Sequence, residues 1–342
     1  MYPYSLPVKV RKSVVKSLRQ LDEIVIDVLI DNQSDSYSSK PAFVSPEFNN
    51  VIAAGSSEIS GTTLCCAQLG LSIMLTAQSG GKRHKMLFDA GPEGDIFIRN
   101  SKNLGVTLDD VEAIGVSHGH WDHMGALVPA LGQITRNGQR QVPCHVNPDM
   151  FYERAARLSN GRTVPFQLVP SISELEEHGA LVVNEADERF LLDEYFYLSG
   201  EIPRISSFEK GRKDHFARAS HDAEWKPDPL LMDERFLAVL IADKGLLLFS
   251  SCSHAGVINV LECAKARFPE LPIFGVFGGL HLVGSLEQII PQTVEAFRTF
   301  ELKQIVPAHC TGWRAVHALL KEFGEEIVVP SAVGSKYTYR SS

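Results

Sequence analysis

The chain has 342 residues, 44% of them apolar, which is enough for a sizeable buried core in one large domain or two closely joined ones and excludes a disordered or fibrous protein. A net charge of -8 and a pI of about 5.9 give no general attraction to nucleic acid. No apolar run approaches the roughly 18 residues that cross a bilayer, and Lys and Arg interrupt the N-terminus too often for a signal peptide, so we expect a cytoplasmic protein without a membrane or nucleic-acid partner.

The first predicted element is an N-terminal arm. Basic and apolar residues mix irregularly over 8–22, so residues 1–24 are expected to form a loose arm or a short amphipathic helix ahead of a main domain of residues 25–342. Three stretches rich in β-branched or apolar residues then predict strands at 23–31, 70–78 and 84–91. A stretch with Pro and acidic residues at its start and Gly at its end predicts a helix at 92–105.

The middle of the chain alternates in the same way. The patterns predict a strand at 111–118, a helix at 124–134, a strand at 140–147 and a helix at 148–158. Residues from about 159 to 235 break this rhythm with five prolines and the charged run "FEKGRKDHFARAS". We expect an elaborated insert there.

The alternation resumes near the C-terminus. A hairpin is predicted to turn at Asp243–Gly245 and a helix to follow at 256–268. Two strand-then-helix units follow, at 272–281 with 286–300 and at 304–310 with 314–324. This alternation predicts α/β layering, in which ligands gather at the ends of strands.

One strand end is unusually rich in ligand-type residues. Three histidines and an aspartate fall within six consecutive positions of "SHGHWDHMGAL", directly after the strand that ends near Ser117: His118, His120, Asp122 and His123. Imidazole nitrogens and carboxylate oxygens are ligands that zinc, iron and manganese accept. Because Asp122 and His123 begin the next helix, they point differently from the first pair, so this segment can supply two metals lying side by side.

These residues also carry a resemblance. The segment "SHGHWDHMGAL" resembles the HxHxDH signature of the metallo-β-lactamase superfamily, and "LFDAG" resembles its first motif. The segments "SCSHAGVINV", "GVFGGLHL", "IVPAHCTGW" and "SGEIPR" are similar to the subgroup of dihydropterin-(ribofuranosyl)aminobenzene phosphate synthase-like proteins. The resemblance covers the chain from about residue 25 and implies an αββα four-layer sandwich with a metal centre at one edge.

The resemblance implies a two-metal site, with departures. One metal would take His118, His120 and a third histidine, and the other Asp122, His123 and His309. The superfamily usually presents a bridging aspartate after the strand that here ends in "SSCSH", so that carboxylate is missing. We expect His254 to complete the first metal, and Cys252 to be either a soft ligand or a buried thiol beside the ligands.

Two further residues are candidates for supporting roles. His281 follows two glycines that allow close backbone approach, and it is expected to be either a ligand or a proton donor to the substrate. Asp89 in "LFDAG" is expected to orient a ligating histidine by a hydrogen bond. Asp122 is expected to act in catalysis as well as in metal binding. Five histidines outside these strand-end positions are expected to be ordinary: His145, His178, His215, His221 and His317.

The expected activity is that of an enzyme, a metal-dependent hydrolase. Two divalent cations, zinc first and iron or manganese as alternatives, would activate water against a small anionic ester, lactone or phosphoester. One alternative is a synthase-like transferase that displaces diphosphate; another is a non-catalytic ligand sensor. The similarity to the subgroup implies that Glu201 and Arg204 bind the substrate, which is expected to be a small molecule. A homodimer is possible.

Overall fold

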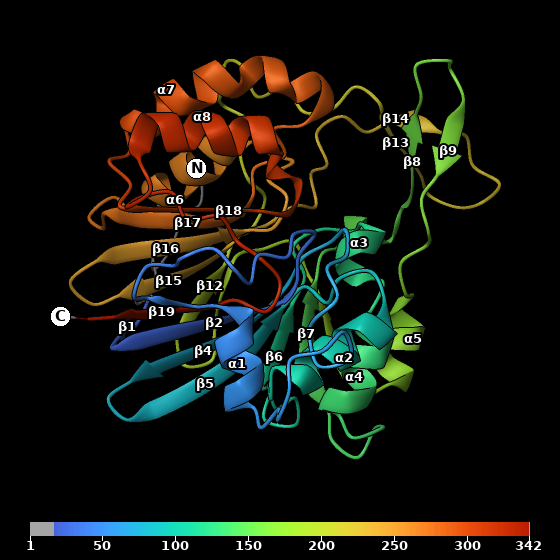
Figure 1. Ribbon diagram of the computed structural model, residues 1–342. Helices are drawn as coiled ribbons and strands as arrows, with labels where there is room; N and C mark the ends of the chain where they lie inside the picture. Colours follow the sequence, from blue (N-terminus) through green and yellow to red (C-terminus); the bar gives the residue numbers. More distant parts are fainter. Residues whose placement is uncertain (1–16, 342) are drawn as a thin grey trace, which may run out of the picture.

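The computed structural model describes residues 17–341, which form two stacked sheets with helices on both outer faces (Figure 1). The first sheet has eight strands. In spatial order they are β10 (Ala180–Asn184), β7 (Val142–Val146), β6 (Ala113–Gly115), β5 (Lys82–Phe88), β4 (Ser72–Ser79), β2 (Glu23–Ile30), β19 (Lys336–Arg340) and β3 (Val44–Ser45).

The second sheet has seven strands and comes mainly from the C-terminal half of the chain. Its order is β11 (Arg189–Leu191), β12 (Phe196–Leu198), β15 (Leu237–Ile241), β16 (Gly245–Ser250), β17 (Ile273–Gly279) and β18 (Gln304–Ala308), with β1 (Gln20–Leu21) paired to β15.

Apolar side chains fill the space between the sheets and beneath each helical layer. The central cluster joins Ile26 and Leu75 of the first sheet to Val239 and Phe277 of the second. The first sheet is covered by α1 (Glu47–Ala53), α2 (Gly94–Asn103), α4 (Leu127–Ile134) and α5 (Ile172–Glu177). The second is covered by α6 (Val257–Arg267), α7 (Ile290–Arg298) and α8 (Trp313–Phe323). This confirms the predicted four-layer sandwich.

Strand direction determines where a site can form. β5, β6 and β7 run parallel to one another, and so do β16, β17 and β18. The carboxyl ends of parallel strands lie at one edge of their sheet, and loops leaving those ends converge there. In this protein the segments that follow β6, β16, β17 and β18 meet between the two sheets.

Two predicted elements differ from the structure. Residues 1–16 of the predicted arm lie outside the described residues, and the described remainder is not helical, because Gln20–Leu21 forms β1 beside β15. The helix predicted at 148–158 is wrong: a short 3-10 helix η1 (Pro148–Phe151) is followed by β8 (Glu153–Arg157), which pairs with β13 (His215–Arg218). Arg154 in that strand is buried and bonded to Asp228 and Asp233, a tertiary demand that overrides local helical preference.

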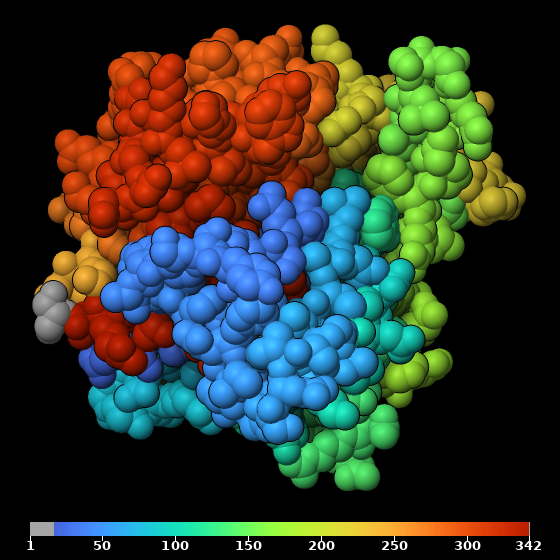
Figure 2. Space-filling view, viewed as in Figure 1, coloured from blue at the N-terminus to red at the C-terminus, as the bar shows by residue number. Residues whose placement is uncertain are grey.

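The predicted insert at about 159–235 is not one unit. Its strands β10, β11 and β12 belong to the two main sheets. A separate four-stranded sheet contains β8, β9 (Thr163–Pro165), β13 and β14 (Lys226–Pro227). In the space-filling view the green part of this sheet stands beside the main body (Figure 2).

No helix among residues 17–341 combines the length and the apolar character that a membrane crossing requires.

Candidate metal centre

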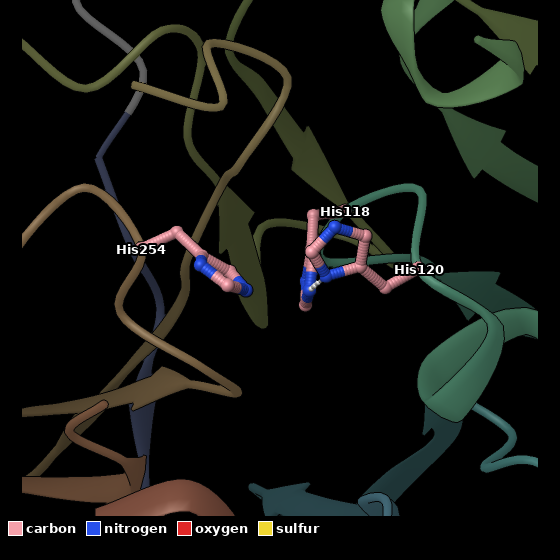
Figure 3. Close-up of side chains that lie close together, drawn as sticks. All are labelled: His118, His120 and His254. Atoms are coloured by element: carbon pink, nitrogen blue, oxygen red, sulfur yellow. Dashed lines mark hydrogen bonds between the residues drawn. The ribbon is translucent and has the colours of Figure 1, made fainter. Parts of the chain in front are cut away.

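Three imidazoles from two distant segments of the chain meet at the edge between the sheets. After β6 the chain turns through His118 and His120 into α3 (Trp121–Met124), while His254 follows β16 and approaches from the other sheet (Figure 3). The ring centroid of His254 lies 4.7 Å from that of His118 and 4.8 Å from that of His120. One ligand atom from each residue lies within 4.8 Å of the other two, a spacing that a single cation can bridge.

A second group of ligand atoms lies beside the first. Asp122, His123 and His309 place their ligand atoms within 4.8 Å of one another, and the Asp122 Oδ2 atom is 3.3 Å from His309 Nε2 and 3.8 Å from His123 Nε2. The His118 and His123 rings are adjacent, with centroids 4.3 Å apart. The two groups are therefore contiguous, as a two-metal centre requires.

Unpaired nitrogens indicate that these residues suit a cation. His254 Nε2 and His309 Nδ1 are buried and make no hydrogen bond to any residue among 17–341, while His309 Nε2 lies 3.3 Å from Asp122 Oδ2. Burial, reinforced by neighbouring cationic groups, lowers the pKa of His118, His120 and His254 well below the usual range. These imidazoles are thus neutral near pH 7, which is the form that binds metal.

In the group of Asp122, His123 and His309, the carboxylate and the imidazoles shift each other's pKa toward the charged forms. Burial raises the pKa of Asp122, but His123 and His309 outweigh it and hold that pKa below its usual range. Burial lowers the pKa of His309, yet Cys310 and Asp122 raise it to about 9. His309 therefore carries a proton when no cation is present, and a bound cation would replace that proton.

Asp89 lies where the predicted orienting role requires it. Its Oδ2 atom is 2.8 Å from His123 Nδ1 and accepts a hydrogen bond from the Ser117 hydroxyl at 2.7 Å, while Oδ1 accepts from the Ser117 backbone N–H. The Ser117 hydroxyl also lies 2.8 Å from His118 Nδ1. Because Nδ1 of His123 is held by Asp89, its Nε2 is the nitrogen left to face the centre.

Three buried carboxylates that sequence reasoning missed hold the backbone of the ligand residues. Asp31 accepts a hydrogen bond from His309 N (3.0 Å), Asp233 from Gly119 N (2.8 Å) and Glu234 from His254 N (2.8 Å). Asp31 directly follows the buried strand β2, the same signal that drew attention to Asp89. Asp233 and Glu234 precede a strand, and no local pattern distinguishes them.

Sulfur atoms form one wall of the centre. Cys252 Sγ lies 3.4 Å from His123 Nε2 and 3.3 Å from Cys310 Sγ. Cys252 was expected near the ligands from the sequence, whereas Cys310 was not, although it directly follows His309. Burial raises the pKa of Cys252, whereas that of Cys310 is lowered despite burial because Cys252 donates a hydrogen bond to it and His281 and His309 lie close.

The centre opens into a pocket of about 270 Å³. Besides the candidate ligands, its lining includes Trp121, Phe166, Arg212 and His215. His215 was expected to be ordinary, but it lies on β13 with its ring centroid 5.3 Å from that of His254. The prediction failed because the position of a separate sheet over the strand ends cannot be read from local spacing.

Glu201 and Arg204 are not brought to the pocket. The Arg204 guanidinium donates to the backbone carbonyls of Ile202, Leu230 and Leu231, and Glu201 is exposed. Neither residue lines the cavity at the centre. Arg204 therefore holds the backbone of its loop, and the basic residue at the pocket is Arg212 from the charged run.

Comparisons with known proteins agree with this fold. The family model described as the metallo-beta-lactamase superfamily matches residues 71–133. The chain is 26% identical over 271 residues to the 7,8-dihydropterin-6-methyl-4-(beta-D-ribofuranosyl)-aminobenzene-5'-phosphate synthase of Methanocaldococcus jannaschii, covering 76% of this chain and 86% of that protein. It is 29% identical to the uncharacterized protein MJ0448 of the same organism, covering 74% and 88%.

Among solved structures, Tm1679, described as a metal-dependent hydrolase of the beta-lactamase superfamily, resembles this protein with a TM-score of 0.67. The likeness covers 93% of this chain and 100% of that one at 22% identity, so it establishes the fold. These relatives support the expectation that the protein is an enzyme. The protein therefore has the metallo-β-lactamase fold, and the family model matches the part of the chain that contains the HxHxDH segment.

Proposed function

We propose that this protein is a metal-dependent hydrolase of a small, anionic ester, lactone or phosphoester. The observation that carries the proposal is the pair of contiguous three-ligand groups at the floor of one pocket. Two adjacent divalent cations supply a strongly acidified water and stabilise charge on both the attacking and the leaving oxygen.

The residues would divide into two ligand sets. His118, His120 and His254 hold one cation, and Asp122, His123 and His309 hold the other. Imidazole and carboxylate ligands suit zinc, which we propose first, as well as iron or manganese. The Asp122 carboxylate, kept ionised by its neighbours, can also accept a hydrogen bond from the attacking water.

The position of Arg212 supports the proposal that the substrate is anionic. It lines the pocket, and its guanidinium is anchored by Asp214 through Nε at 3.0 Å. A guanidinium fixed in this way presents its remaining N–H groups to a carboxylate or phosphate. The aromatic ring of Phe166 and the indole of Trp121 supply apolar surface beside it.

A transferase is the second candidate, favoured by the similarity to the aminobenzene phosphate synthase. In that reaction the same ligand groups and Arg212 would hold a diphosphate leaving group while the amino nitrogen of the aminobenzene attacks a pterin methylene carbon and releases one proton. The pocket would then need to admit two substrates and exclude water.

The two candidates differ in what becomes of water. Zinc-loaded enzyme would be offered chromogenic esters, lactones and phosphodiesters in ¹⁸O-labelled water, and separately a pterin diphosphate with and without an aminobenzene partner. A hydrolase incorporates label with one substrate, whereas a transferase releases diphosphate only when both substrates are present. Asp122→Asn and His120→Ala should be folded and inactive, and turnover by metal-stripped protein would contradict both candidates.

A further inference from the structure

Three neighbouring strands deliver a sulfur-containing cluster that the two ligand sets above do not use. Cys252 follows β16, His281 follows β17, and Cys310 lies in the 3-10 helix η3 (His309–Thr311) that follows β18. Because β16, β17 and β18 are adjacent and parallel, their carboxyl ends place these three side chains together.

The cluster is compact, with Cys252 and His281 buried and Cys310 partly buried. One ligand atom of each of Cys252, His281 and Cys310 lies within 4.8 Å of the other two, and the two sulfurs are 3.3 Å apart. Cys252 is 2% exposed and His281 8% exposed. At Gly279 a Cβ would come within 2.6 Å of Cys310 Sγ, so only glycine allows this sulfur to lie against the backbone of β17.

One nitrogen of the cluster is free to bind a ligand. His281 Nδ1 is buried and makes no hydrogen bond to any residue that the structure describes, while Nε2 lies 3.2 Å from Arg212 Nη1. Arg212 can only donate, so Nε2 accepts its N–H and the ring proton lies on Nδ1. A cation on Nδ1 would displace this proton to Nε2 and break the hydrogen bond with Arg212, which would keep its bonds to Asp214.

We propose that Cys252, His281 and Cys310 form an additional, thiophilic position of the centre that binds a zinc ion. Thiolates favour zinc over harder cations such as manganese or magnesium. Two sulfurs at 2.3 Å from one tetrahedral zinc lie about 3.8 Å apart, so the observed sulfur pair needs to open by only about half an ångström. Two thiolates also balance the charge of the dication.

Cys252 joins this position to the rest of the centre. Its sulfur lies 3.4 Å from His123 Nε2, and His118, His123 and Cys252 themselves form a group within 4.8 Å. A thiolate has lone pairs for two metals, so Cys252 can be shared between the thiophilic position and the histidine ligands. The missing bridging aspartate is then replaced by a softer bridging ligand.

Cobalt spectroscopy of the full chain tests the proposal without reference to turnover. Reduced, metal-stripped protein titrated with Co²⁺ should develop a thiolate-to-cobalt charge-transfer band in the near ultraviolet, and Zn²⁺ should abolish it. The band should fall to about half in Cys310→Ser and disappear in the Cys252→Ser/Cys310→Ser double variant. Cys263→Ser, which removes a thiol on α6 outside the cluster, should leave it unchanged.

A second measurement uses only the wild type and so does not depend on the variants folding. Zinc should protect Cys252 and Cys310 from alkylation at least tenfold, as mapped by peptide mass spectrometry, while Cys66 serves as a reference thiol. The proposal is overturned by the absence of a near-ultraviolet band, by equal alkylation with and without zinc, or by a Cys252–Cys310 disulfide in metal-loaded protein. A band without any turnover would uphold this position and remove the proposed reaction instead.

Discussion

At the scale of single residues, the centre depends on side chains that are not themselves proposed metal ligands. Asp89 is fully buried, and its carboxylate is 2.8 Å from His123 Nδ1. A carboxylate there selects the tautomer of His123 whose Nε2 lone pair faces the centre. The same carboxylate accepts two hydrogen bonds from Ser117, which in turn contacts His118.

Replacing Asp89 by Asn should weaken metal binding without unfolding the chain. The amide keeps the shape of the carboxylate but can turn its NH₂ toward His123 Nδ1, which favours the wrong tautomer. We expect a loss of about 10–100-fold in metal affinity, measured by competition with a chromogenic chelator. Asp109→Asn, which removes an exposed ion pair with Arg136, should leave the affinity unchanged. Wild-type affinity in Asp89→Asn would show that the tautomer is fixed elsewhere.

His145 should make stability depend on pH. Burial, with Arg189 and Arg235 nearby, lowers its pKa from 6.5 to about 4. Between these values the unfolded chain binds a proton that the folded protein does not, so the free energy of unfolding falls as pH drops below about 6.5. The loss attributable to His145 is about 2 kcal/mol at pH 5.

The measurement is urea unfolding at pH 7.5 and pH 5. His145→Gln should narrow the difference in unfolding free energy between the two pH values by about 2 kcal/mol. His221→Gln changes a histidine whose side chain is 86% exposed and should leave the difference as in the wild type. An unchanged difference in His145→Gln would mean that other buried groups dominate acid sensitivity.

Sequence reasoning at this scale succeeded where function is carried by one short segment. His118, His120, Asp122 and His123 adjoin one strand and lie together in the structure. It missed Cys310, His215 and Asp31, because each reaches the site from an element whose position relative to the others is set by packing. The spacing of residues along the chain does not predict which strand ends will be neighbours in the fold.

At the scale of elements, close backbone packing positions the ligand turn. Gly119, between His118 and His120, lies so near η1 that a Cβ would come within 2.1 Å of the Met150 carbonyl oxygen. Its N–H donates to Asp233 at 2.8 Å. A side chain at this position would have to displace the turn and with it both ligands.

Gly119→Ala should therefore destabilise the fold by about 2 kcal/mol or more and reduce the metal content per chain. Gly132→Ala in α4 is the matched control, since a Cβ there meets only Asn137 Oδ1 at 3.5 Å. Helix propensity predicts that the control is neutral or more stable by up to about 1 kcal/mol. Urea unfolding and elemental analysis measure both effects, and wild-type values for Gly119→Ala would refute the packing argument.

Most elements could be predicted because their periodicity and their burial agree. β2, β4, β5 and the strand-then-helix units after β15 lie where the patterns placed them. The failures have tertiary causes. The sequence of β8 has a helical pattern, but β8 pairs with β13. β19 lies between β2 and β3 in the first sheet and comes from a C-terminal segment for which no strand was expected.

At the scale of the whole molecule, the centre links two sheets built from different parts of the chain. His118, His120 and His123 follow β6 of the eight-stranded sheet, whereas His254 and His309 follow β16 and β18 of the seven-stranded sheet. Any cation bound by either ligand set joins both sheets. Without it, neutral imidazoles lie beside a protonated His309, and His254 Nε2 and His309 Nδ1 have no hydrogen-bond partner among the described residues.

Removing the metal should therefore lower the stability of the whole fold rather than of one loop. A cation at 100 times its dissociation constant adds about 2.7 kcal/mol per site, which for a chain of 342 residues corresponds to roughly 4 °C in melting temperature per site. Calorimetry with zinc and with chelator should show this decrease as a shift of one cooperative transition, since both sheets lose the same link. His254→Ala, which removes one ligand contributed by the second sheet, should retain a smaller shift. A chelator effect confined to local hydrogen exchange around residues 118–123, with the melting temperature unchanged, would mean that packing between the sheets alone holds the two halves together.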